Sequence, residues 1–344
     1  MRFYFLIIIL LNGLVGFSQK NRFIEIKSEL EIKEKWSFLE NILKEKRIVA
    51  LGENLHGVKE YNSTKLELIK YLHEELGFNV LAIESDVARN YYGNLYKAEI
   101  ADTTFLKQLF TPPWHTEEHL EIVKYIKTKS DLKIIGFDVE RKISVNEIAE
   151  KLRIEIDTSD IKTELFQENY KKWLEVNGRF RVKISQRDST MAQVLDWIIN
   201  DLYPEEKIII SAHNNHISNK EIKGACMGEI LKKKNGNQYY SIGFFHSLGN
   251  PKHVMRKVIY KNDKSQLPKN SIQYRFLESG KEKLFVDIIN QKMKNNWLFE
   301  ELDNVLLLNE YEYRLKLADS FDGLIWIKTV TYPKYVIRNK YLEK

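Results

Sequence analysis

The sequence predicts an α/β fold in which a mostly parallel sheet is flanked by helices and carries a helical insert. Short, wholly apolar runs alternate along the chain with long stretches whose apolar residues recur at helical spacing. Strands that are apolar throughout are typical of parallel sheets covered on both faces. The composition agrees, because 43% apolar residues, 30% charged residues and 6 prolines are ordinary for a globular protein. A length of 344 residues allows one large domain with an insert or two modest domains.

The first elements form a predicted βαβ unit. A helical pattern over residues 30–43 precedes the apolar run 48–51, which we interpret as a buried strand. The next helix, over about 59–76, ends at Gly77, the usual left-handed cap, and residues 78–83 form the second strand.

The same alternation continues through the rest of the chain. Two mostly helical regions, roughly 87–130 and 145–202, form the predicted insertion, and they are followed by strands at 132–137 and 207–210. The pattern is weak between residues 250 and 300. The remaining predicted strands are 239–245, 305–308 and 324–327, the last two as late or edge strands.

Each of five predicted strands stops at an ionisable residue, directly or within two positions. In open parallel sheets, ligands bind outside the carboxyl ends of the strands, so five such residues there describe one pocket. Any single one is better explained by a strand reaching the surface, whereas five together are not. These residues are Glu53, Glu84, Asp138, His213 and His246.

The first strand-to-helix turn carries Glu53-x-x-His56-Gly57. Histidine, with a pKa of about 6.5, is the natural general base at neutral pH, and a nearby carboxylate would hold its tautomer. Gly57 permits close approach of the backbone to a ligand. Taken alone, this spacing is more often a surface pair.

Two histidines three residues apart, His213 and His216, follow the fourth strand. They could bind a metal, polarise a carbonyl or hydrogen-bond their own loop, and a zinc site would need a third ligand. That ligand could be Glu53, His56, Glu84 or Asp138. The run from His115 to His119 lacks a zincin arrangement, because no glutamate directly follows the first histidine, and we leave it out of the site.

Several chemistries lack their motifs. The chain has no Gly-x-Ser-x-Gly elbow, no phosphate loop and no Gly-x-Gly-x-x-Gly after the first strand. Cys226 is the single cysteine and has no obvious base beside it, which favours water as the nucleophile. Net charge is +6 with the basic residues scattered apart from Lys232-Lys233-Lys234, so nucleic acid is not expected as a partner.

Five segments share their order and spacing with a known family. They are Ala50-Leu51-Gly52-Glu53-Asn54-Leu55-His56-Gly57, Leu81-Ala82-Ile83-Glu84, Gly136-Phe137-Asp138, Arg187-Asp188-Ser189-Thr190-Met191-Ala192, and Ala212-His213-Asn214-Asn215-His216 with Met227-Gly228 beyond it. The closing Phe321-Asp322-Gly323 also fits. Together they resemble the erythromycin esterase family across most of the chain.

The resemblance implies an α/β core with a helical insert and a metal-independent hydrolysis of a carboxylic ester, a macrolactone or another. It implies that His56 activates water, that Glu53 and Glu84 support it, and that His213 lies beside the reacting carbonyl. Many members carry arginine where this chain has Lys65, which keeps the charge but loses the planar fork. The expected substrate-binding residues are Lys65, Asp138, Arg187, His216 and His246.

Two alternatives remain open. In one, the same pocket holds a divalent metal, which would make the protein a metal-dependent hydrolase, although no cofactor is expected from the resemblance. In the other, the protein is an exported member that binds a ligand without turnover. The presence of both Glu53 and His56 favours catalysis on a small-molecule ester.

The N-terminus predicts a signal peptide over residues 1–18. Arg2 precedes an apolar run from Phe3 to Leu11, which is too short to span a membrane, and small residues at Gly16 and Ser18 suit a cleavage site after Ser18. The mature domain would be 19–344, exported to the periplasm or secreted, with no stable membrane insertion after cleavage. Macrolide-inactivating members act inside the cell, so the expected export argues against a macrolide as the substrate.

Overall fold

A computed structural model shows the fold of this chain. It describes residues 23–139, 142–157, 159, 161–177, 183–253, 258–259, 263–291, 296–307 and 310–337. The predicted signal peptide, 1–18, lies outside the described residues.

Within these residues, eight strands form one sheet in the order β1-β9-β12-β6-β2-β5-β3-β4. The six strands from β12 to β4 run parallel, whereas β9 pairs antiparallel with both β12 and β1. The predicted α/β class with a mostly parallel sheet is therefore confirmed. The strands are β1 Phe23–Glu25, β2 Ile48–Leu51, β3 Phe78–Asp86, β4 Lys133–Asp138, β5 Lys207–Ser211, β6 Tyr239–Asn250, β9 Lys283–Asp287 and β12 Gly323–Thr331.

Two small antiparallel pairs lie outside this sheet. They are β7 Lys252–His253 with β8 Val258–Ile259, and β10 Glu301–Leu307 with β11 Glu310–Lys316.

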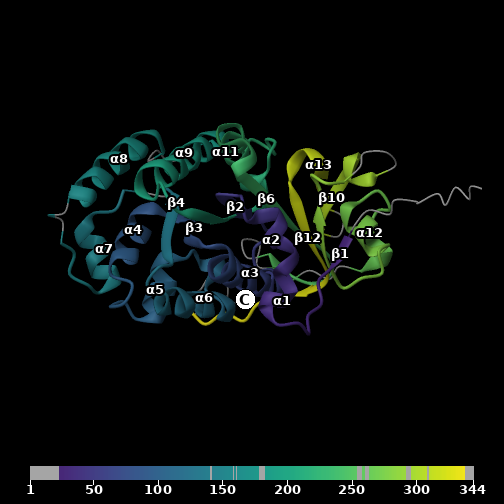
Figure 1. The fold of residues 1–344 in the computed structure, drawn as a ribbon, viewed down its shortest axis with the longest axis horizontal. Helices are drawn as coiled ribbons and strands as arrows, with labels where there is room; N and C mark the ends of the chain where they lie inside the picture. The colour runs from purple at the N-terminus through teal and green to yellow at the C-terminus, as the bar shows by residue number, and fades with distance from the viewer. Residues whose placement is uncertain are drawn as a thin grey trace, which may run out of the picture.

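Helices cover both faces of the sheet. Figure 1 shows α9 and α11 on one side and α3 and α6 on the other. The α-helices are α1 Ile32–Trp36, α2 Glu40–Leu43, α3 Lys59–Leu76, α4 Val87–Leu95, α5 Asp102–Leu109, α6 Glu117–Thr128, α7 Val145–Leu152, α8 Ile161–Asn177, α9 Ile184–Trp197, α10 Asn214–Ile217, α11 Met227–Asn235, α12 Ile272–Leu277 and α13 Leu317–Ser320. The 3-10 turns are η1 Ser37–Leu39, η2 Pro112–Trp114, η4 Gly236–Gln238, η5 Lys264–Gln266 and η6 Trp297–Phe299, and η3 Ile198–Leu202 is a π-helical turn.

The first βαβ unit forms for the reasons that the sequence indicates. β2 is apolar at all four positions because it is buried between β5 and β6. α3 ends at Gly77, which has a φ of 71°, and its N–H caps the carbonyls of Leu72 and His73. Glycine adopts this left-handed conformation without the steric cost that a Cβ would bring.

Four predictions about the strands need correction. β3 and β6 run past Glu84 and His246, so these residues lie within strands and not at their ends. The predicted strand 324–327 lies in β12, which is late in the chain as one alternative had it, but β12 lies between β9 and β6 and not at an edge. The run 305–308 falls mostly in β10, which pairs with β11 in a separate two-stranded sheet. β1 and β9 were not predicted, because each is short and neither follows a long helix.

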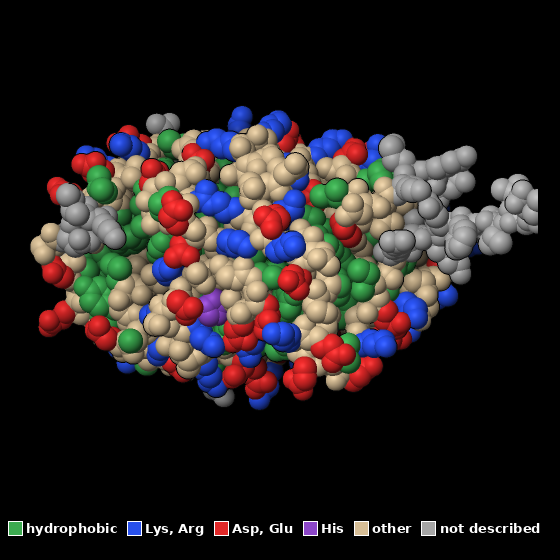
Figure 2. Space-filling model, in the orientation of Figure 1, with side chains coloured by type: hydrophobic (Ala, Val, Ile, Leu, Met, Phe, Trp, Pro, Cys, Tyr) green, Lys and Arg blue, Asp and Glu red, His purple; other side chains and the backbone are tan. Residues whose placement is uncertain are grey.

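The two regions predicted as a helical insertion contain α4, α5 and α6, and then α7, α8 and α9. Among the described residues, no helix combines the length and apolarity that a membrane crossing requires. Figure 2 shows acidic and basic side chains interspersed over the visible face.

Candidate active site

The loops after β2 and β5 meet at the carboxyl edge of the sheet. Gly52 makes this meeting possible, because a Cβ at that position would lie 2.0 Å from Oδ1 of Asn214 in α10. The backbone N–H of Asn214 donates to the carbonyl oxygen of Glu53 over 2.7 Å. The turn that carries Glu53 and the turn that carries His213 are thereby joined directly.

Glu53 and His56 form a dyad in the loop between β2 and α3. Nδ1 of His56 lies 2.5 Å from Oε1 of Glu53. Gly57 follows with a φ of 81°, which turns the chain into α3 immediately after the histidine. The carboxylate accepts the Nδ1 proton, so Nε2 is left as the basic nitrogen of the ring.

Glu53 is buried and surrounded by donors. Lys65 of α3 donates to its Oε2 over 2.8 Å, and the indole N–H of Trp114 donates to its Oε1 over 3.1 Å. Burial alone would raise the pKa of Glu53, but the charge of Lys65 and the hydrogen bond from His56 outweigh burial and lower that pKa to about 2. Glu53 therefore stays ionised at any pH at which the protein works.

His56 remains accessible, since 30% of its side chain is exposed. Burial lowers the pKa of His56, whereas the hydrogen bond to Glu53 and the charges of Glu53 and Glu84 raise it, and the net direction is upward. Its ring packs edge-on against Trp114, with centroids 5.5 Å apart, and lies 5.3 Å from the ring of His213.

His213 faces the dyad as a neutral ring with both nitrogens engaged. Its Nε2 lies 3.1 Å from the carbonyl oxygen of Asn54 and so carries the proton. Its Nδ1 accepts the N–H of Asn215 over 3.3 Å. Burial and the nearby His56 and His216 lower the pKa of His213 to about 3. His213 is therefore a fixed polar wall of the site and not a proton acceptor.

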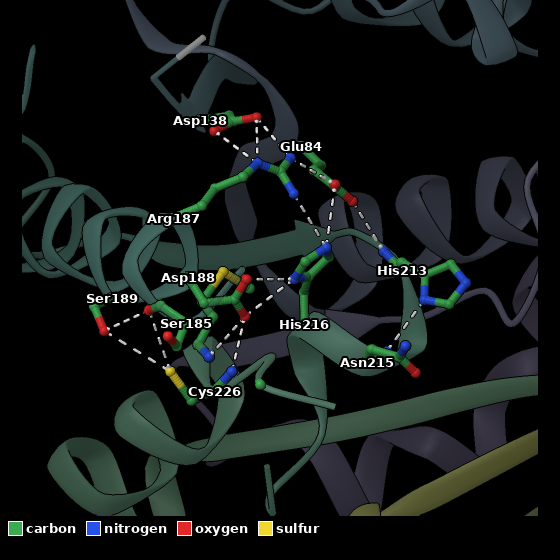
Figure 3. Close-up of polar contacts among 12 residues, drawn as sticks. Glu84, Asp138, Ser185, Arg187, Asp188, Ser189, His213, Asn215, His216 and Cys226 are labelled. Carbon is green, nitrogen blue, oxygen red and sulfur yellow. Dashed lines mark hydrogen bonds and ion pairs between the residues drawn. The ribbon is translucent and has the colours of Figure 1, made fainter. Parts of the chain in front are cut away.

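A second group of charges adjoins His213, and Figure 3 shows it. Glu84 accepts the backbone N–H of His213 over 3.1 Å and an Nη2 hydrogen of Arg187 over 3.0 Å. Arg187 also contacts Asp138 through Nη2 over 2.6 Å. His216 lies between two carboxylates, with Nδ1 2.9 Å from Asp188 and Nε2 3.4 Å from Glu84.

These contacts fix the charge of each member. Burial lowers the pKa of His216, but Glu84 and Asp188 outweigh it and raise that pKa to about 10. Burial likewise opposes ionisation of Glu84, yet His216 and Arg187 hold the pKa of Glu84 well below its usual range. At neutral pH the group therefore contains an imidazolium, a guanidinium and their carboxylate partners.

The structure brings most of the predicted site residues together, but it places two differently from the prediction. Lys65 is 2% exposed and contacts Glu53 and Ser211, so it supports the dyad from behind. His246 is 1% exposed, and its Nδ1 contacts only the hydroxyl of Tyr61 among the hydrogen bonds described. Neither side chain lines the accessible part of the site, because both lie beneath it.

Sequence reasoning missed Trp114, Asp188 and Asn54. Trp114 stands in η2 after Pro113, where no strand end points to it, yet it contacts both members of the dyad. Asp188 is part of the quoted Arg187–Ala192 segment, and only the contact with His216 reveals its role. His119, which was left out of the site, is buried within 6.2 Å of the Trp114 ring, and burial lowers its pKa to about 3.

The donor set of the site is taken up by protein cations. Glu53 binds Lys65, and Glu84 and Asp138 bind Arg187. Within the described part of the chain, no group of three or more His, Cys, Asp or Glu residues has the arrangement of a metal site. The carboxylates of Glu53, Glu84 and Asp138 are thus already paired with side-chain cations of the protein.

The fold and the site define an α/β protein with a carboxylate-supported histidine at the carboxyl edge of a parallel sheet. The model of the erythromycin esterase family matches residues 158–330, half of the chain. The chain belongs to the erythromycin esterase family, which places it among the hydrolases.

Two relatives match over most of their length. A candidate hydrolase, YbfO of Bacillus subtilis (strain 168), is 26% identical over 88% of this chain and 87% of its own. Erythromycin esterase type II of Escherichia coli is 24% identical over 84% of this chain and 91% of its own.

Solved structures share the fold. The crystal structure of a succinoglycan biosynthesis protein has a TM-score of 0.71 at 18% identity and covers 91% of this chain and 96% of its own. A Bacillus cereus protein matches with the same TM-score at 20% identity, covering 91% of this chain and 95% of its own. The erythromycin esterase EreC, in its open conformation, has a TM-score of 0.63 at 15% identity, covering 89% of this chain and 96% of its own.

Proposed function

We propose that this protein hydrolyses a carboxylic ester with a water molecule activated by His56. The observation that carries the proposal is the Glu53–His56 contact of 2.5 Å, which leaves Nε2 as the basic nitrogen on a partly exposed ring. A histidine whose other nitrogen is held by a buried carboxylate is the arrangement that general-base catalysis requires.

In the proposed reaction, Nε2 of His56 takes a proton from water while the water oxygen attacks the ester carbonyl. Glu53 stabilises the imidazolium that forms. The tetrahedral intermediate then breaks its bond to the alcohol oxygen, and His56 returns the proton to that oxygen as it leaves. The products are a carboxylic acid and an alcohol.

The negative charge that develops on the carbonyl oxygen requires a positive partner. Arg187 is suited to this role, because its side chain is 33% exposed and Asp138 and Glu84 hold it in place. His213, neutral and fixed, would lie beside the carbonyl and orient it. The relatives' names supply the first esters to try, a macrolactone such as erythromycin together with simple linear esters.

The first test replaces His56 with glutamine. We expect His56→Gln to lower kcat roughly 10²- to 10⁴-fold on the best ester of the panel, the usual contribution of a positioned general base. His73→Gln is the matched control, since His73 is buried near the far end of α3, roughly 20 Å along the helix from its first residue. Circular dichroism checks that both variants fold. A near-normal kcat in His56→Gln would show that another group is the base.

We also propose that the hydrolysis is independent of a metal, because Lys65 and Arg187 already engage the carboxylates of the site. We expect turnover to survive dialysis against a chelator, with less than one equivalent of zinc or manganese per chain by elemental analysis. A pH profile cannot make this distinction, because metal-bound water also ionises near a pH of about 7. Stoichiometric metal, with activity lost on chelation and restored by one ion, would establish the metal-dependent alternative.

A further inference from the structure

A cavity of about 470 Å³ lies beneath the segment that follows β12. The end of β12 and the segment after it contact two separate elements. At the end of β12, the backbone N–H and hydroxyl of Thr331 both donate to Glu60 of α3 over 2.7 Å. Further on, the N–H of Glu117 donates to the carbonyl of Lys334 over 3.0 Å. The cavity is lined by Lys59, Glu117, Glu118, Thr331, Tyr332, Pro333, Lys334 and Tyr335.

Three connections place this cavity beside the dyad. Lys59 is the first residue of α3 and follows His56 by three positions. Glu117 follows Trp114, which packs against His56, by three positions. Tyr335 pairs with Thr116, two residues after Trp114, through an isolated antiparallel bridge, and the N–H of Val336 donates to the carbonyl of His115 over 2.9 Å.

Glu118 carries the carboxylate oxygen of this cavity that lacks a hydrogen-bond partner in the described part of the chain. Lys59 and Lys334 also line the cavity; Lys334 pairs with Glu117 over 2.5 Å, and Lys59 is exposed to solvent. Glu118 is half-buried, and its Oε2 is buried without a hydrogen-bond partner among the described residues. A carboxylate in such a position is costly unless a cation or donor approaches it. The rings of Tyr332 and Tyr335 add aromatic faces, which attract cations.

We propose that this cavity binds a positively charged ammonium group of the substrate, on the side of the scissile bond that faces α6. The inference rests on the proposed ester hydrolysis and adds the substrate class, an ester that carries an alkylammonium group. The carboxylate of Glu118 supplies the charge, and Tyr332 and Tyr335 supply the aromatic walls. A volume of about 470 Å³ is within the range of small-ligand pockets.

The test compares two esters of the same shape that differ only in charge. They are the choline ester and the 3,3-dimethylbutyl ester of the acid that the enzyme accepts best. We expect the native protein to favour the choline ester by about tenfold in kcat/KM. Glu118→Gln should bring the ratio of the two kcat/KM values close to one. Glu121→Gln, which removes an exposed carboxylate one turn further along α6, should keep the ratio.

Because the readout is a ratio, a general loss of folding or activity cancels from it. A ratio near one in the native protein, preference for the neutral ester, or an unchanged ratio in Glu118→Gln would overturn the inference. A binding measurement separates it from the proposed function: NMR titration with choline and with 3,3-dimethylbutanol needs no turnover. Choline binding that Glu118→Gln weakens supports the cavity even if both esters resist hydrolysis, and equal binding of both alcohols counts against it.

Discussion

Three histidines of the site lie close to one another, yet their environments drive their charges apart. His216 is held between Asp188 and Glu84 and stays protonated, with a pKa raised to about 10. His213 is buried and lies beside His56 and His216. Burial and these two rings lower its pKa to about 3, so it stays neutral. Of the three, His56 has a partly exposed ring and neither the strongly raised pKa of His216 nor the strongly lowered pKa of His213, so it is the one suited to exchange a proton with substrate.

Despite burial, the carboxylate of Glu53 raises the pKa of His56, and the pH profile of a Trp114→Phe variant can test this effect. In Trp114→Phe the ring against His56 is kept, but Oε1 of Glu53 loses its indole donor. The oxygen then interacts with His56 alone, which should raise the pKa of His56 further. Because the base acts when neutral, we expect the acidic limb of the kcat/KM profile to move to higher pH. Activity should fall by roughly 10- to 150-fold, since a hydrogen bond to a charged group contributes about 1.5–3 kcal/mol and each 1.4 kcal/mol is about tenfold in rate.

Trp197→Phe is the matched control for this experiment. Trp197 is half-buried at the end of α9, where its ring contacts Phe166 and Trp173 and not the dyad. The control should leave the acidic limb where it is. An unmoved limb in Trp114→Phe would mean that Trp114 only fills space.

The individual site residues were predictable to different degrees. Glu53 and His213 could be found because parallel strands end at one edge of a sheet. Glu84 was expected at a strand end and lies two residues before the end of β3, yet the structure brings it to His213. His246 followed the same rule and was placed wrongly, because β6 continues past it and buries its ring. Trp114 could not be found, since its contact with Glu53 depends on how a Pro-Pro turn folds back over the sheet.

At the scale of elements, Asp188 joins three helices. It lies in α9, contacts His216 of α10, and accepts the N–H groups of Cys226 and Met227 at the start of α11 over 2.9 and 3.1 Å. It therefore caps α11 while it holds the imidazolium, and Figure 3 shows these contacts.

We expect Asp188→Asn to lower the free energy of unfolding by about 3–5 kcal/mol at pH 7, because it breaks a buried charge pair. Urea denaturation measures the change. Asp196→Asn is the matched control on the same helix, where the carboxylate is partly exposed and pairs with Lys234, so it should cost less than about 1 kcal/mol. Equal effects of the two substitutions would contradict the role of Asp188.

The pH dependence of this effect has a definite sign. The folded-state pKa of His216 is raised to about 10 from an ordinary value of 6.5, so its stabilising contribution is complete below pH 6.5 and is lost as the pH rises to 10. The difference in stability between the native protein and Asp188→Asn should therefore shrink over that interval. A constant difference would indicate that the cap, and not the charge pair, accounts for the stabilisation.

The elements themselves were predictable where they alternate. The first βαβ unit agrees with its prediction. The fully apolar run of β2 and the helical spacing of α3 are both clear local patterns, and each marks where the other element must begin or end. The chain after residue 250 was not predictable in the same way. β9 has five residues and pairs antiparallel with β12, a long-range contact that local periodicity does not reveal. The strand order that places β12 inside the sheet depends on the same contact.

At the scale of the whole molecule, the sheet separates structural support from chemistry. β1 and β9 extend one side of the sheet without contributing a site residue, while β2, β3 and β5 lie side by side and carry the dyad, Glu84 and His213 at one edge. The segment after β12 then crosses to α3 and α6 at that same edge. The two ends of the described chain therefore have different roles. β1 forms the edge of the sheet, and residues 332–335 line the cavity beside α3 and α6.

We propose that the whole molecule is exported, with a mature chain that begins near Gln19. The run from Phe3 to Leu11 has the length and apolarity of a signal-peptide core, and a charge at its centre would cost about 2.5–3.5 kcal/mol on insertion scales. Ile8→Arg should therefore keep the protein in the cytoplasm with residues 1–18 intact, while the control Lys27→Gln should not. N-terminal sequencing of protein from separated cell fractions measures both outcomes. Recovery of the native protein in the cytosolic fraction, still beginning at Met1, would contradict export.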